Sequence, residues 1–73
     1  MSDDRDIEKS YLKKEHIAKL QRLVESLKAG KAYTIQVDGE RLYVPSHAQL
    51  SIEHERNGDV EELEFQLRWT RSS

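Results

Sequence analysis

Three histidines are the residues best suited to catalysis or metal binding, because imidazole titrates near neutral pH and ligates metals. They are His16, His47 and His54. His16 falls at the margin of the apolar stripe of an expected helix. His47 follows a proline in a loop, and His54 falls near the tip of an expected hairpin. No two of them have a metal-ligand spacing such as i and i+4 on one helix, so the pattern predicts three unrelated, partly exposed histidines and no metal site.

Acidic residues alternate along the last third of the chain and form a second candidate. Glu53, Glu55, Glu62 and Glu64 are expected to share the outer face of a hairpin, where they can bind a cation or a basic peptide. Hard cations usually take their ligands from a loop that wraps the ion, and a strand surface does not wrap. A glycosidase pair needs a cleft and one raised pKa, neither of which is indicated. The pattern favours a solvated acidic face without a cofactor.

Arg41, Tyr43 and Arg68 are also expected to point outward. An aromatic residue among bases on a sheet can stack single-stranded nucleic acid. The acidic neighbours would repel phosphate, however, and one tyrosine is not a platform. The alternative contact to a phosphate backbone is the basic side of the helix, with Lys14, Lys19 and Arg22 interrupted by Glu15 and Glu25.

Trp69 is the only tryptophan. It can serve as a lid over the end of the helix, or as an exposed anchor in a dimer or peptide interface, where Trp is enriched. No Ser-His-Asp or Cys-His nucleophile set is visible, and each glycine has a turn or cap role rather than a place in a phosphate-binding loop. We therefore expect this protein not to be an enzyme.

Length and composition predict one small cytoplasmic domain. The chain has 73 residues and no Cys, which suits a reducing compartment and leaves a thin core without disulfides. No apolar run approaches the roughly 18–20 residues that span a bilayer, and the acidic residues 1–6 lack the apolar stretch of a signal peptide. We expect residues 1–6 to be a flexible acidic tail and residues 7–71 to form the domain.

The net charge of −2 is unevenly distributed. Residues 9–31 carry seven bases and two acids, a net +5, whereas residues 32–73 carry eight acids and four bases, a net −4. The folded molecule should therefore have a basic side and an acidic side. Such asymmetry can steer a partner, but two solvated faces are the simpler interpretation.

Apolar periodicity predicts a helix over residues 13–29, preceded by a short strand over residues 7–12. Ile17, Leu20, Val24 and Leu27 recur at steps of three and four, which places them on one face of a helix. Gly30 is the expected end, at the position where a left-handed residue closes a helix.

Two hairpins should follow the helix. In the first, Asp38-Gly39 forms the turn, so that Val37 faces Glu40, Ile35 faces Leu42 and Tyr33 faces Val44. In the second, Asn57-Gly58 is expected to form the turn. That register pairs Ile52 with Leu63, Leu50 with Phe65, Ser51 with Glu64 and Glu53 with Glu62.

Together, these elements predict an α+β fold with the order β-α-β-β-β-β. The last strand alternates, so Leu63, Phe65, Leu67 and Trp69 share one side. We expect this side of a mainly antiparallel sheet to pack on the apolar stripe of the helix as a two-layer sandwich. The other face of the sheet is expected to be exposed to solvent.

The order of elements resembles the amphi-Trp domain family of small prokaryotic proteins over residues 7–71. The resemblance is carried by the helix that closes on Lys28-Ala29-Gly30, by the Asp38-Gly39 hairpin, and by the amphipathic strand Leu63-Glu64-Phe65-Gln66-Leu67-Arg68-Trp69. It implies the same fold. It implies no catalytic residues, because the family has no established biochemical function.

We expect a non-enzymatic module that binds a protein partner or a second copy, through an edge strand or the outer sheet face. Binding of nucleic acid through the basic side of the helix is the alternative, and no membrane association is expected. The candidate interaction surface comprises Arg41, Tyr43, Glu53, Glu62, Glu64, Arg68 and Trp69.

Overall fold

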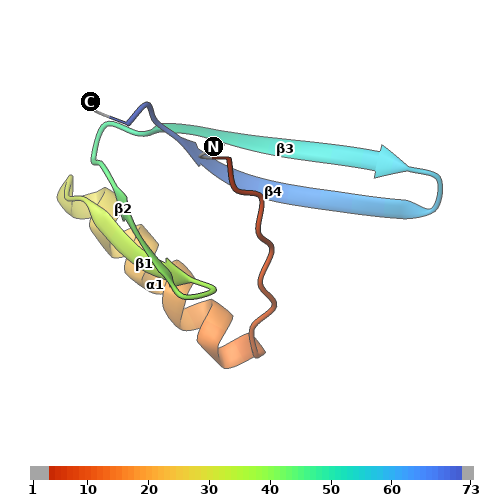
Figure 1. The fold of residues 1–73 in the computed structure, drawn as a ribbon, viewed down its shortest axis with the longest axis horizontal. Coiled ribbons are helices and arrows are strands. Elements are labelled where there is room, and N and C mark those ends of the chain that lie inside the picture. The colour runs from red at the N-terminus through yellow and green to blue at the C-terminus, as the bar shows by residue number, and fades with distance from the viewer. Residues whose placement is uncertain (1–3, 72–73) are drawn as a thin grey trace.

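The computed structural model describes residues 4–71 and has an α+β fold, as predicted. One helix precedes four strands: α1 (Lys13–Ala29), β1 (Tyr33–Val37), β2 (Glu40–Val44), β3 (Gln49–Asn57) and β4 (Val60–Arg68). The strands form two separate antiparallel hairpins, β1–β2 and β3–β4 (Figure 1).

Helix α1 is closed at both ends by local hydrogen bonds. At its start, the backbone N–H of Leu12 donates to Glu15 Oε1 at 3.3 Å. At its end, Gly30 adopts the left-handed conformation (φ 65°) and its N–H donates to Leu27 O, while Lys31 N–H donates to Ser26 O. This is the Schellman arrangement that favours glycine, so the predicted end of the helix is confirmed.

The first hairpin has the predicted register. Tyr33 faces Val44, Ile35 faces Leu42 and Val37 faces Glu40. Asp38 and Gly39 both have positive φ, 46° and 86°, as a type I′ turn requires.

Helix α1 covers the first hairpin and is tied to it by side chains. The Tyr33 hydroxyl donates to Lys19 O at 2.9 Å, and Arg22 Nη1 donates to Thr34 O at 3.0 Å. Tyr33 and Val44 are the only buried apolar residues among residues 4–71. The core of the described chain is therefore one small contact between α1 and the first hairpin.

The second hairpin forms, but its predicted register is wrong by two residues. The loop is Gly58-Asp59, so Ile52 faces Phe65, Leu50 faces Leu67 and Glu53 faces Glu64. Gly58 takes the positive φ (63°) at the first loop position, as in a type II′ turn, so Asn57 need not adopt it. This register also pairs Leu50 with Leu67 and brings Arg56 opposite Glu61. Because the shift is even, every side chain keeps its predicted face.

The predicted strand over residues 7–12 is absent, since these residues form no ladder in the described chain. The segment runs between the second hairpin and the start of α1 (Figure 1). The Tyr11 side chain attaches it to the first hairpin instead, by donating its hydroxyl proton to Gln36 O at 3.2 Å. Just before the segment, Arg5 Nη2 donates to Val37 O at 2.6 Å. Its poor alternation explains this, because no face of it is consistently apolar.

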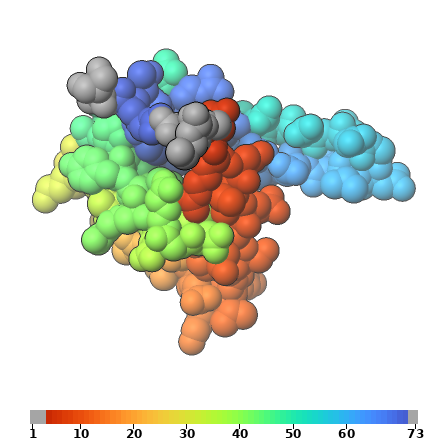
Figure 2. Space-filling view, viewed as in Figure 1, coloured from red at the N-terminus to blue at the C-terminus, as the bar shows by residue number. Residues whose placement is uncertain are grey.

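The two hairpins were expected in one mainly antiparallel sheet, and this expectation is wrong, because they do not join. Pro45 follows β2 directly and has no N–H to donate to a ladder. Ala48 N–H donates to Pro45 O at 3.2 Å, so the chain turns before β3 begins. The β3–β4 hairpin therefore projects from the rest of the molecule, as Figures 1 and 2 show.

This projection leaves the apolar face of β4 in solvent. Leu63 is 63% exposed and Phe65 is 66% exposed, so the expectation that they pack on α1 is wrong. The radius of gyration is 13.9 Å, against about 11 Å for a compact domain of this length. The molecule is open because a hairpin with nine residues in each strand projects with most of its apolar side uncovered.

Removal of the Tyr33 hydroxyl should destabilise the fold. The variant Tyr33→Phe leaves the Lys19 carbonyl without its side-chain donor, and we expect a loss of about 1 kcal/mol in the free energy of urea unfolding. Tyr43→Phe is the matched control, because Tyr43 lies on the same hairpin but is 68% exposed. Equal effects of the two variants would contradict the assigned role of Tyr33.

Candidate interaction surface

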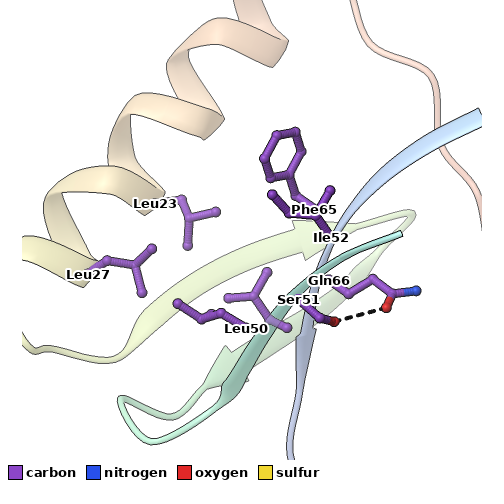
Figure 3. Close-up of a pocket in the computed structure, with 8 residues that line it drawn as sticks. Leu23, Leu27, Leu50, Ser51, Ile52, Phe65 and Gln66 are labelled. Carbon is purple, nitrogen blue, oxygen red and sulfur yellow. Dashed lines mark hydrogen bonds between the residues drawn. The ribbon is translucent and has the colours of Figure 1, made fainter. Parts of the chain in front are cut away.

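An apolar groove lies between α1 and the β3–β4 hairpin. It has a volume of about 320 Å³. Figure 3 shows Leu23 and Leu27 of the helix on one side and Leu50, Ile52 and Phe65 of the hairpin on the other. The two walls come from elements that do not pack on each other, so apolar side chains face a space rather than a core.

A second hollow of about 360 Å³ continues this groove beneath the end of β4. It shares Leu23 and Leu67 with the first groove. Its remaining walls come from the helix, the first hairpin and the N-terminal segment, namely Lys9, Tyr11, His16, Lys19, Leu20, Tyr33, Ile35, Leu42, Val44 and Trp69. Trp69 is half-buried there, so it lines an open hollow instead of closing a finished core.

The apolar stripe of α1 is also incompletely covered, although it is less exposed than the apolar face of the hairpin. Ile17, Leu20, Val24 and Leu27 are each 43–46% exposed, and the helix contributes no buried residue. Side chains at this spacing form one continuous face. Together with Ile52, Leu63 and Phe65, this stripe makes up the apolar face of the molecule.

The predicted site residues divide between two sheets. Glu53, Glu62, Glu64 and Arg68 lie on the outer face of β3–β4, opposite the apolar face. Arg41 and Tyr43 lie on β2, in the other sheet, where they pair with Gln36 and Thr34. The structure therefore brings the acids together but does not place them beside Arg41 and Tyr43 on one sheet surface.

Three of the acids on the outer face of β3–β4 lie close together. Oxygen atoms of Glu55, Glu62 and Glu64 lie within 4.8 Å of one another. A hydrogen bond with Glu64 and the negative charges around it raise the pKa of Glu62. The same hydrogen bond, together with one from the Gln66 amide, lowers the pKa of Glu64. The cluster is flat and largely exposed, so it has the geometry of a charged surface rather than of a wrapped cation site.

A third cluster lies at the tip of the hairpin, on the same side as Leu63. Glu61 Oε1 lies 2.7 Å from His54 Nε2 and 2.9 Å from Arg56 Nη2. The hydrogen bonds from His54 and then Arg56 lower the pKa of the Glu61 carboxyl. The sequence analysis did not single out this cluster, although the register it used placed His54 directly opposite Glu61.

The apolar groove was also missed, since every residue lining it was expected in the core. One signal was available in the strand lengths. The strands of the second hairpin have nine residues and span about 30 Å, whereas those of the first have five and span about 17 Å. A hairpin this long extends beyond the layer that the first hairpin forms with α1.

Comparison of the chain with family models, with curated proteins and with solved structures finds no match. The resemblance to the amphi-Trp domain family therefore stays a prediction. Among the described residues, no helix has the length and apolar character needed to cross a membrane.

Two neighbouring glutamates should respond oppositely to neutralisation. Glu62→Gln removes a like-charge contact, so we expect the thermal unfolding temperature at pH 7 to rise by about 1–2 °C. Glu61→Gln removes the negative charge that Arg56 faces and leaves a neutral amide oxygen as the acceptor, so it should lower the unfolding temperature by a similar amount.

The pH dependence of the two effects follows from linkage. Because the pKa of Glu62 is raised in the folded state, its favourable contribution to the free energy of unfolding is lost as the pH rises through that pKa. The stabilisation by Glu62→Gln should therefore be largest above that pKa. The pKa of Glu61 is lowered, so its contribution is lost as pH falls through that pKa. Both differences should shrink as the pH is lowered, because protonation removes the charge of both carboxyls. Shifts of the same sign at pH 7 would contradict the assignment.

Proposed function

We propose that this protein is a small non-enzymatic interaction module whose main partner is a second copy of itself. The observation that carries the proposal is the apolar face, which runs over α1 and β3–β4 and is left exposed in the single chain. Contiguous apolar surface of this extent marks an interaction site in proteins that do not aggregate.

The accessible area supports this proposal. The single chain exposes 6876 Å². A compact monomer of 8.6 kDa would expose about 4,700 Å², so the excess is about 2,200 Å². Stable interfaces bury about 800 Å² on each partner, and obligate dimers bury more. The excess is therefore sufficient for an obligate dimer.

The thinness of the core supports it as well. Only Tyr33 and Val44 are buried among the described residues, and the chain has no disulfide to compensate. Domains below about 70–80 residues commonly need an additional source of stability, and oligomerisation is one. Association would bury the stripe of α1 and the apolar side of β4, which the monomer cannot do.

The alternative, nucleic-acid binding through the helix, has weaker support. Lys19 Nζ lies 4.7 Å from the centroid of the Tyr11 ring. The Arg22 guanidinium lies 5.2 Å from the Tyr33 ring centroid and donates to Thr34 O. Two of the three bases suggested for phosphate contact are thus engaged within the chain, and the projecting hairpin is acidic.

Sedimentation equilibrium tests the proposal, and we expect a dimer at micromolar concentration. Phe65→Asn should weaken the dimer at least about 30-fold, the effect of losing a central apolar anchor. Val60→Asn is the matched control, because Val60 lies on the same strand with the same 66% exposure but on the opposite face. A wild-type monomer at high concentration, or equal weakening by both variants, would refute the proposal.

A further inference from the structure

We propose that the two copies associate by exchange, with the β3–β4 hairpin of each chain lying along α1 of the other. The inference rests on the proposed self-association and specifies its geometry. It differs from the two simpler arrangements, in which hairpin packs on hairpin or helix packs on helix. Three observations favour exchange.

The first observation is the match between the two exposed faces. The stripe of α1 from Ile17 to Leu27 covers ten residue steps, about 15 Å. The apolar row of β4 from Leu63 to Leu67 covers four steps, about 13 Å. Ile52 lies beside this row, opposite Phe65, and widens it. Each face is thus about the length of the other, and both are apolar.

The second observation is charge. Residues 49–68 carry six acids and two bases, a net −4, whereas residues 13–29 carry five bases and two acids, a net +3. Packing hairpin on hairpin would bring two strongly negative elements together, and packing helix on helix would bring two positive ones together. Packing hairpin on helix brings together elements of opposite net charge. Four of the hairpin acids lie on its outer face, so this attraction acts over a distance and steers the encounter of the two chains.

The third observation is the connection between the hairpins. Only residues 45–48 separate β2 from β3, and the Ala48–Pro45 hydrogen bond folds this link into a turn. At the base of the hairpin, Leu50 and Leu67 line a groove with Leu23 and Leu27 of the same chain. Leu63, nearer the tip, lines neither hollow. The short link leaves the hairpin projecting from its own chain, and short hinge links favour exchange between copies.

The absence of cysteine makes the geometry testable by disulfide trapping. Two single variants, Val24→Cys and Leu63→Cys, are mixed in urea, refolded together and oxidised, and the products are separated on a non-reducing gel. Val24 lies in the helix stripe and Leu63 on the apolar row of the hairpin. A disulfide between the two variants can form only between chains. We expect it to form at least about tenfold faster than in the control mixture of Val24→Cys with Val60→Cys, whose cysteine lies on the outer face.

The outcomes separate this inference from the proposed function. Sedimentation of the wild-type chain and of each single variant is measured alongside. A wild-type monomer overturns both proposals. A wild-type dimer in which Leu63→Cys pairs fastest with itself means that hairpin packs on hairpin, and overturns the exchange alone. A dimer in which the two mixtures cross-link at equal rates also overturns the exchange.

Discussion

The break between the two hairpins, which begins at Pro45, is the constraint on which the rest of the structure depends. The ladder of the first hairpin ends at Val44, Pro45 has no backbone N–H with which to extend it, and β3 pairs with β4 and not with β2. The following turn sends β3 away from β2. The two hairpins therefore become two sheets, α1 covers only the shorter one, and the longer one projects. The exposed apolar face is a consequence of this break, because the residues on it have the spacing of a core but no layer above them.

Local features of the fold could be predicted from the sequence where one turn or cap permits one geometry. Asp38-Gly39 fixes the first register, because both residues tolerate positive φ and the flanking apolar residues pair only in that alignment. Gly30 fixes the helix end for a similar reason. The Asn57-Gly58-Asp59 run offers two alternative two-residue loops. Both keep the apolar side chains on one face, so periodicity could not choose between them.

Nonlocal features could not be predicted in the same way. Alternation in β4 identifies which side chains belong together, but it does not identify what covers them. Leu63 and Phe65 were assigned to a core because a core is the usual destination of such a face, and in the single chain they are exposed. The acidic residues were placed correctly on the outer face of β3–β4, since the alternation that defines the apolar face also defines its opposite. Their separation from Arg41 and Tyr43 depends on the break at Pro45.

Stability and association therefore depend on burial of the same apolar surface. In the described chain, the burial within one copy is limited to the contact of α1 with the first hairpin, centred on Tyr33 and Val44. Conformational entropy opposes folding at about 1–2 kcal/mol per ordered residue, and so small a core offsets little of it. Residues 49–68 gain almost no tertiary burial in the monomer, yet a two-stranded hairpin alone is at best marginally stable in water. Covering their apolar side with a second chain would supply the apolar burial that the monomer lacks. The ordering of this hairpin should therefore be coupled to protomer concentration. The surface that distinguishes this protein is therefore also the part of its core that one chain cannot complete.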